Sequence, residues 1–497
     1  MMRMKTSESF KLMSHKLAAS CGPIISRMRA PSFTGFLTII LLLAFTLRVH
    51  DLYVTTPDSP WGLDEECWLS GAYFYNLLFL KHDFTNEDWY HYISYDSPPM
   101  TDYVLGFALH AVNNKIVDES GNKMNWFKRI HELYCRNPFE KLVEEKNLSE
   151  DRRLLEFCNR LLAEVKPRGV VALTREDYVL GKRTIFIFAF LSSILVILLC
   201  SHFLKSGFTG LLAALLFLSN NLTIPNFQKV YNDAICSFFV LTSLIILLIL
   251  LKRMKPFVDG RMDSGKHGIG FPKSVIMLSV LEGFSLSLAL NTKFVTLYMV
   301  LTAVLAFTAG VTYDTLYQRR SGRQLLLRRA TIWVCVLALV SVSTLTFYIL
   351  ANPYLYPDPV GNTLKTIEHR VNYMAVQSRV QISPITSLRH RIRLIYSRGI
   401  LLDYDFRSPP LEYLYVLVFL TGLWSIMHGA RREMSAGSAG TYTILLLWII
   451  SAFTVNGSKM NMNWERYYIP FVMCTVIIVS IGAERIIKSI KPEFTRD

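Results

Sequence analysis

The sequence predicts an all-α membrane protein that crosses the bilayer about ten times, with interfacial helices and two large outside loops. Apolar runs of roughly 17–22 residues recur along the chain, and each is long enough to cross about 30 Å of hydrocarbon as a helix. Hydrophobic residues make up 52% of the 497 residues, and the mean hydropathy is +0.31. Lys and Arg gather in short loops beside the apolar runs, as the positive-inside pattern requires.

The charge and cysteine content limit the classes of partner and cofactor. Because the net charge of +15 is concentrated beside the spans, it indicates orientation in the bilayer, and we expect no nucleic-acid partner. The eight Cys show no metal-type spacing such as Cys-x-x-Cys, so no zinc or iron–sulfur site is predicted. No cofactor is expected, although the sequence leaves a divalent metal open.

The first element is a basic segment, 1–32, followed by a span over 33–49. The segment carries six Lys and Arg against the single acid Glu8, which predicts a cytoplasmic N-terminus. Since no small-residue cleavage site follows the apolar run, we interpret this run as a signal-anchor. Residues 50–181 then form the first large loop on the outer side.

Within that loop, the apolar stretch 98–112 is only about 15 residues long. This length favours a helix at the membrane interface over a crossing. A crossing would also turn the later basic loops outward. The insert 113–181 shows helical spacing and is expected to be a helical hairpin that covers the site or, alternatively, a surface for a partner. Thr174 and Asp177 have the spacing of a capping box before the next span.

The later spans follow in regular order, with a second large outside loop at 351–411. They are expected near 184–204, 208–224, 233–251, 274–290, 294–312, 330–350, 412–428, 440–456 and 467–483. With the first span, they make ten crossings and place the tail 484–497 in the cytoplasm beside the N-terminus. The transmembrane domain is therefore predicted to extend over 33–483.

Six motifs occur in a fixed order along this chain. They are WGLDEECW (61–68), DSPPMTDYVLG (96–106), GKRTIFIFAFL (181–191), KVYNDAICSFFVL (229–241), GFSLSLALNTKFVTL (283–297) and NWERYYIPFVM (463–473). In this order they resemble polytopic GT-C glycosyltransferases, and they are most similar to the branch of protein O-mannosyltransferases, aminoarabinose lipid A transferases and RgtA/B/C/D-like enzymes.

The resemblance implies an inverting hexosyl- or pentosyltransferase. The donor would be a sugar linked to polyprenyl or dolichyl phosphate, and the acceptor would be a hydroxyl of a protein, a lipid or a growing glycan. The reaction would take place on the lumenal or periplasmic face of an endoplasmic reticulum membrane or a prokaryotic plasma membrane.

The acids just outside the first span suit this chemistry. A carboxylate that is hydrogen-bonded to an acceptor hydroxyl can remove its proton as the new bond forms. Asp64 matches the catalytic aspartate of the family, Glu65 matches its partner acid, and Glu66 departs from the usual pattern. The alternative is that these acids form an exposed start of a helix over 66–80, where they would interact favourably with the helix dipole.

The donor phosphate requires cations, and three occur at expected outer ends of spans. They are Lys293 in the matching Thr-Lys pair, Arg183 beside Lys182, and Arg466. Each could instead be a boundary residue that extends to the lipid surface. Further expected donor-site residues are Tyr95, Asp96, His91 and Asp233; His369, Arg370 and Arg379 are weaker candidates from the second loop.

Two other classes of function remain open at this stage. Glu282 falls near the middle of a span, and an intramembrane acid indicates either a functional site or a buried polar contact. A secondary transporter or lipid flippase would be expected to show internal repeats and interrupted spans with polar residues near the midplane; this sequence shows no internal repeat, and Glu282 is its one candidate acid. A non-catalytic scaffold with the same fold is the third alternative.

Overall fold

The computed structural model describes residues 63–90, 99–117, 173–258, 271–317, 323–380, 385, 387–406, 408–435, 440–460 and 462–490. All of them belong to one compact unit that extends from His50 to Asp497. The expected first span, the segment before it, most of the 113–181 insert and the end of the tail lie outside the described residues. The expected domain boundaries therefore stay predictions.

Eight helices among the described residues are long and apolar enough to cross a membrane, which confirms the expected fold class. The spans occupy Arg175–Phe203, Asp233–Pro256, Lys273–Leu290, Phe294–Tyr313, Leu327–Leu350, Pro409–Ser435, Thr441–Ser458 and Glu465–Ile490. They are formed by α10 (Arg175–Leu198) with η5 (Leu199–Phe203), α13 (Asp233–Val258), α14 (Lys273–Leu290), η6 (Phe294–Thr296) with α15 (Leu297–Tyr317), α16 (Arg323–Leu350), α19 (Pro409–Ser435), α20 (Thr441–Lys459), and η10 (Glu465–Tyr468) with α21 (Ile469–Ile490).

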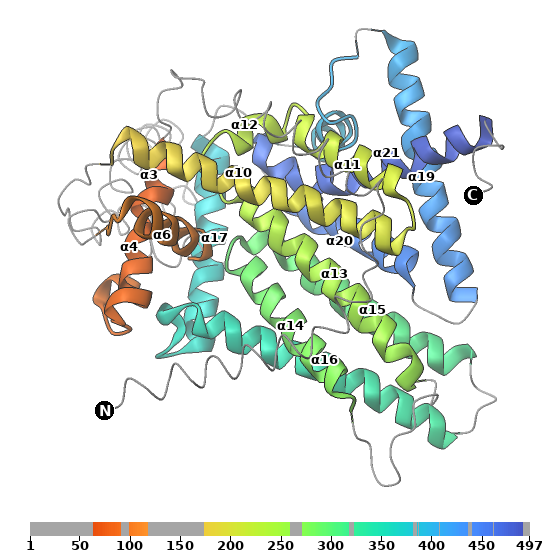
Figure 1. The fold of residues 1–497 in the computed structure, drawn as a ribbon, viewed down its shortest axis with the longest axis horizontal. Helices are drawn as coiled ribbons and strands as arrows, with labels where there is room; N and C mark the ends of the chain where they lie inside the picture. Colours follow the sequence, from red (N-terminus) through yellow and green to blue (C-terminus); the bar gives the residue numbers. More distant parts are fainter. Residues whose placement is uncertain are drawn as a thin grey trace, which may run out of the picture. The chain divides into compact units, whose positions relative to one another are not determined.

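Helices α10, α13, α14 and α16 pack in that order as one layer (Figure 1). Helix α10 begins earlier than the apolar run because Thr174 caps it. The Thr174 hydroxyl accepts a hydrogen bond from the Asp177 backbone N–H, and the Asp177 carboxylate accepts one from the Thr174 N–H. This confirms the predicted capping box.

The expected span 208–224 is the one that the structure corrects. Helix α11 (Gly207–Ser219) has only 13 residues, a length of about 20 Å, and α12 (Thr223–Phe227) follows it. The helix ends because the Asn220 side chain competes for the backbone. Its amide donates to the carbonyl of Phe217, and its oxygen accepts from the N–H of Thr223 at 2.9 Å.

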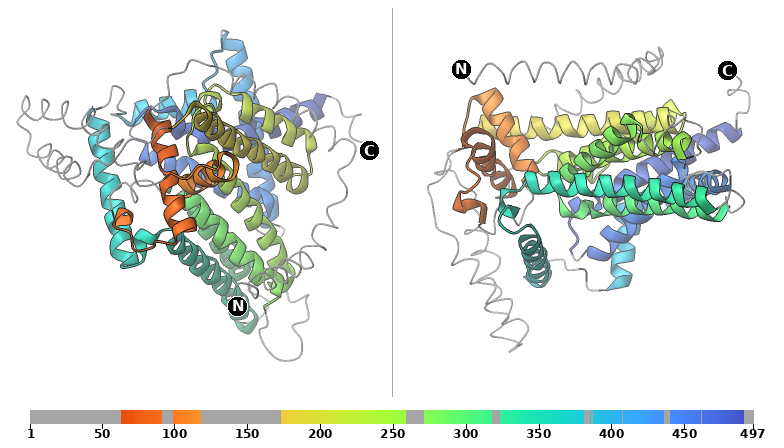
Figure 2. Two further views of the ribbon diagram at one scale, coloured as in Figure 1. Left: turned by 60° about the vertical axis from the view of Figure 1, so that its left-hand side comes forward. Right: turned by 90° about the horizontal axis from the view of Figure 1, so that it is seen from below.

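A group of short helices lies at the end of the layer where α10 and α13 begin and where α14 and α16 end (Figures 1 and 2). It contains α3 (Leu63–Ser70), α4 (Ala72–Tyr75), η1 (Asn76–Lys81), η2 (Glu87–Tyr90) and α6 (Met100–Asn113). Helix α6 has 14 residues, too few to cross about 30 Å. Its close approach to α4 depends on Gly106, because a Cβ there would lie 2.3 Å from Cβ of Tyr75 and 3.1 Å from the carbonyl oxygen of Ala72.

The second large loop, 351–411, is mostly helical. After α16 come η8 (Pro353–Leu355), α17 (Pro359–Val380), α18 (Leu388–Leu394) and η9 (Ile395–Ile400). Helix α17 runs across the direction of α14 and α16, and it is seen almost end-on when α16 is seen from the side (Figures 1 and 2).

Helices α19 and α21 approach so closely that glycine is required on both. A Cβ at Gly422 would lie 1.8 Å from the carbonyl oxygen of Ile478, and a Cβ at Gly482 would lie 1.9 Å from that of Val418. Small residues at such crossings let two helix backbones pack in direct contact.

Candidate functional site

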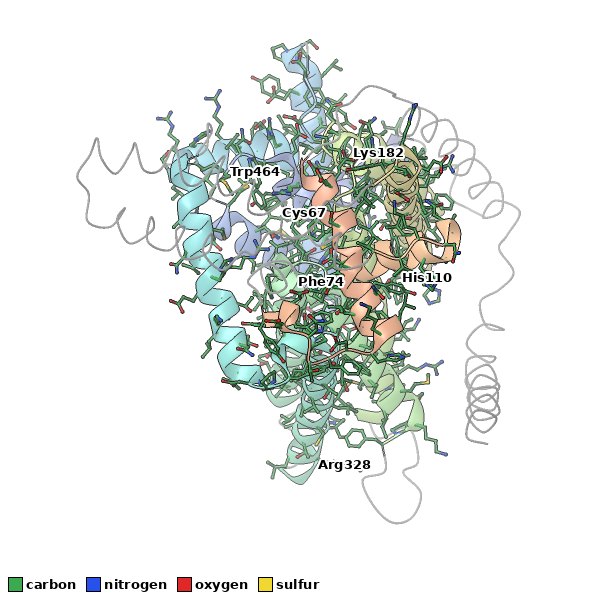
Figure 3. The ribbon with its side chains drawn as sticks, turned by 90° about the vertical axis from the view of Figure 1, so that its left-hand side faces the viewer. Cys67, Phe74, His110, Lys182, Arg328 and Trp464 are labelled. Atoms are coloured by element: carbon green, nitrogen blue, oxygen red, sulfur yellow. The ribbon has the colours of Figure 1, made fainter. Side chains whose placement is uncertain are left out.

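Residues 229–233, which join α12 to α13, connect most of the segments singled out in the sequence. We call this segment the 229–233 junction. Val230 contacts α3, Tyr231 contacts the segment before α21, and Asn232 and Asp233 both contact residues 292–293. The junction lies at the end of the layer that also carries α3. Figure 3 looks onto this end, with Lys182 and Trp464 on either side of Cys67.

The first contact joins the junction to the acidic motif on α3. The backbone N–H of Val230 donates to Oε1 of Glu65 at 3.1 Å, and Nζ of Lys182 lies 3.9 Å from the same oxygen. Glu65 is only 1% exposed. Glu65 is therefore not the exposed helix start that the alternative interpretation required. Its carboxylate ties α3 to both the junction and α10.

The second contact is an ion pair between the start of α13 and the residue that follows α14 by three positions. Nζ of Lys293 donates to Oδ1 of Asp233 at 2.6 Å, and their side chains are 16% and 3% exposed. The amide of Asn232 donates to the backbone carbonyl of Thr292 at 3.1 Å. Because a neighbouring residue also bridges the two segments, the start of α13 and the end of α14 are fixed to each other.

The third contact adds an aromatic cluster from the start of α21. The Arg466 guanidinium lies 4.4 Å from the ring centre of Trp464 and 5.7 Å from that of Tyr231. The rings of Trp464 and Tyr467 stack at 5.6 Å. Nζ of Lys293 lies 5.8 Å from the Tyr467 ring and Arg466 lies 6.0 Å from it, so the two cations flank one aromatic ring. A cation within about 6 Å of an aromatic ring is attracted to the face of that ring.

Helix α6 adjoins this cluster at the Lys293 side. The N–H of Met100 donates to the carbonyl of Asn291 at 2.8 Å, and the Tyr103 hydroxyl donates to the carbonyl of Ala351 at 2.8 Å. Burial, together with the charge of Asp102, raises the pKa of Tyr103 well above its ordinary value, so the phenol stays a donor. The Asn352 amide also donates to the Asn291 side chain. The proline motif therefore leads into a helix anchored two residues before Lys293.

The structure thus brings together Glu65, Asp233, Lys293 and Arg466, which were selected from separate motifs. Arg183, by contrast, is exposed, and its neighbour Lys182 contacts Glu65. His369 is buried on α17 and Arg370 is half-buried there. The backbone of Asp64 lies in α3, but its side chain is outside the described residues, as are His91, Tyr95, Asp96 and the side chain of Arg379.

Glu282 lies within the spans rather than at their ends. It is fully buried on α14, and its Oε1 accepts a hydrogen bond from the Ser243 hydroxyl of α13 at 2.7 Å. Of its two expected roles, this contact matches the polar link between helices. Within the described residues, Oε2 of Glu282 has no hydrogen-bond partner.

Sequence reasoning overlooked four components of the cluster: Tyr231, Trp464, Tyr467 and the backbone N–H of Val230. The three aromatic side chains left a signal, since each lies within two positions of a residue that was selected. The N–H left none, because every residue except proline carries one. Within the described part of the chain, no group of three or more His, Cys, Asp and Glu residues is arranged to hold a metal ion. What the cluster can do chemically is hold an anion between fixed cations beside aromatic surfaces.

Comparisons with known proteins add a weak likeness. No protein-family model matches the sequence, and no curated protein matches it. The chain is similar to solved structures of the oligosaccharyltransferase AglB from Archaeoglobus fulgidus. One, in complex with an inhibitory peptide and a dolichol-phosphate, is 12% identical with a TM-score of 0.44, over 93% of this chain and 52% of that one.

The apo form of the Archaeoglobus fulgidus enzyme is 12% identical with a TM-score of 0.45, over 91% of this chain and 50% of that one. A third structure, tethered to an acceptor peptide that contains the NVT sequon, is 12% identical with a TM-score of 0.42, over 91% of this chain and 50% of that one. The chain therefore spans about half the length of these proteins.

Proposed function

We propose that this protein is a membrane glycosyltransferase that transfers a sugar from a polyprenyl- or dolichyl-phosphate donor to an acceptor hydroxyl. One observation carries the proposal. The motifs that resemble GT-C enzymes come from distant segments, and four of them contact one another around the 229–233 junction. Independent segments that share a family resemblance and also converge in space are expected of one active site.

In this proposal Asp64 is the general base. The acceptor hydroxyl transfers its proton to the Asp64 carboxylate, the hydroxyl oxygen bonds to the anomeric carbon, and the polyprenyl phosphate leaves with the bonding electrons. Glu65 cannot readily meet an acceptor, because it is buried and already accepts the Val230 N–H. It is instead a positioning residue that holds α3, and therefore the backbone of Asp64, against the junction.

The leaving phosphate keeps negative charge, which Arg466 and Lys293 would stabilise. Both lie at the ends of candidate spans, at the level where the phosphate of a membrane-anchored donor would enter. Asp233 orients Lys293 through the 2.6 Å hydrogen bond. Trp464 and Tyr467 supply flat apolar surfaces beside the cations, which suit a sugar ring or an isoprenoid chain.

The distribution of polar groups favours a transferase over a transporter. The cations and acids of the cluster gather at one end of the spans, whereas transporter sites lie near the bilayer midplane at interrupted helices. Glu282 is the intramembrane acid singled out by the sequence, and it is hydrogen-bonded between two intact helices.

The deciding experiment uses purified full-length protein in liposomes. Dolichyl-phosphate mannose and a polyprenyl-phosphate pentose, each radiolabelled in the sugar, are supplied with peptide, lipid and glycan acceptors. Asp64→Asn should lower transfer by about 10²–10⁴-fold while donor binding persists, and Glu66→Gln serves as the matched control. Near-normal transfer in Asp64→Asn would contradict the base assignment. Movement of labelled lipid across the bilayer without any transfer would favour a flippase.

A further inference from the structure

Helix α17 carries an exposed apolar stripe. Val360, Leu364, Ile367 and Val371 are 71%, 61%, 52% and 59% exposed. Their spacing of four, three and four residues places them within about 60° of one another around the helix axis. A stripe of this kind normally faces a core, yet here it faces away from the rest of the protein.

The opposite side of α17 is polar and packs inward. Thr366 and His369 are each only 4% exposed. Near the start of the helix, Asn362 exchanges hydrogen bonds with Tyr354 of η8. Its amide donates to the Tyr354 carbonyl at 2.8 Å, and its own carbonyl accepts from the Tyr354 hydroxyl at 3.0 Å. The helix therefore buries polar side chains and exposes apolar ones, which is the reverse of a surface helix in a soluble protein.

The surroundings of α17 indicate what covers its apolar side. Helix α17 follows the candidate span α16, with only the short helix η8 between them. In α16, the side chains of Val342, Leu345 and Leu350 are 62%, 59% and 55% exposed. Exposed apolar side chains on a span face lipid. Helix α17 is joined to the end of α16 through η8, and it runs across the direction of the spans, as a helix in the membrane plane does (Figures 1 and 2).

We propose that α17 is an in-plane membrane helix whose Val360–Val371 stripe inserts into the boundary between phospholipid headgroups and acyl chains. The partner is the bilayer itself. A second protein helix is the less favoured occupant, because α17 lies across the spans beside the end of α16, whose own exposed side chains are apolar. Through η8 and the Asn352–Asn291 hydrogen bond, α17 is linked to the segment that carries Lys293.

Photo-crosslinking of full-length protein in phosphatidylcholine–phosphatidylglycerol liposomes tests this directly. Benzoylphenylalanine replaces Leu364 or Ile367 in separate variants, and Lys365 in the control. Lys365 is also exposed but lies about 100° around the helix from Leu364. We expect phospholipid adducts, measured by mass spectrometry, to be at least about fivefold more abundant at 364 and 367 than at 365.

Three results would overturn the proposal: equal adduct yields at all three positions, crosslinks to a second copy of the chain, or crosslinks to another segment of the same chain. The test needs no transferase activity. A failure here would therefore leave the proposed function standing, and the reverse is also true.

Discussion

The Lys293 ammonium donates to Oδ1 of Asp233 at 2.6 Å, which joins two residues 60 positions apart in the sequence. Asp233 begins α13 and Lys293 follows the end of α14, so the pair joins two span ends. It also adds one positive and one negative charge to the cluster. Oδ2 of Asp233 has no hydrogen-bond partner among the described residues. The carboxylate therefore depends heavily on this lysine.

Lys293→Met should destabilise the protein by about 3 kcal/mol or more, because it leaves the buried Asp233 carboxylate without its cation. Adding Asp233→Asn should restore part of that loss, so the double variant is more stable than the sum of the two single changes predicts. Thermal unfolding in detergent measures the cycle, with Lys252→Met at the far end of α13 as the control. Strict additivity would contradict the pairing.

The two anchoring roles of Glu65 can be separated by substitution. Glu65→Gln keeps an oxygen that can accept the Val230 N–H, whereas Glu65→Ala leaves that buried donor unsatisfied at a cost of about 1–3 kcal/mol. We expect the alanine variant to unfold at a clearly lower temperature than the glutamine variant. In transfer assays, Glu65→Gln should lose less activity than Asp64→Asn. A larger loss in Glu65→Gln would move the catalytic base to Glu65.

A lysine at position 466 should not restore the donor binding that Arg466 provides. The planar guanidinium stacks over Trp464 at 4.4 Å, and a lysine ammonium is a point charge without that flat surface. The KM for the lipid-linked donor should rise about 10-fold or more in both Arg466→Lys and Arg466→Ala, equivalent to at least about 1.4 kcal/mol of lost binding. Arg431→Ala, on α19, is the matched control. A normal KM in the lysine variant would show that only charge matters at this position.

Gly422→Ala should lower the thermal stability in detergent, because its new methyl group would lie only 1.8 Å from the Ile478 carbonyl oxygen. The helices α19 and α21 would have to separate, with loss of their close backbone packing. Gly207→Ala provides the control, since a Cβ there meets nothing within 4 Å. If both variants unfold at the same temperature, close contact at this crossing does not contribute to stability.

The sequence by itself determined the spans. Eight of the nine expected in the described part of the chain are present, because the length of an apolar run is set by the thickness of the bilayer and needs no tertiary information. The exception, 208–224, contains Asn220, whose side chain satisfies backbone groups and ends the helix early. Hydropathy alone does not register that local competition.

The sequence also singled out Asp233, Lys293 and Arg466, because charges at span ends stand out against apolar surroundings, and Glu65, because it matches the partner acid of the resembling family. It did not determine their partners. Lys182 contacts Glu65 and its neighbour Arg183 is exposed, since adjacent residues point about 100° apart on a helix.

Only the tertiary structure decided that one five-residue junction joins these segments, because ion pairs and ring contacts depend on how the spans pack. It also decided the orientation of α17. The apolar spacing from Val360 to Val371 is visible in the sequence, but a stripe of that kind can face either a core or a membrane. The inward packing of Thr366 and His369 selects the outward side for the stripe.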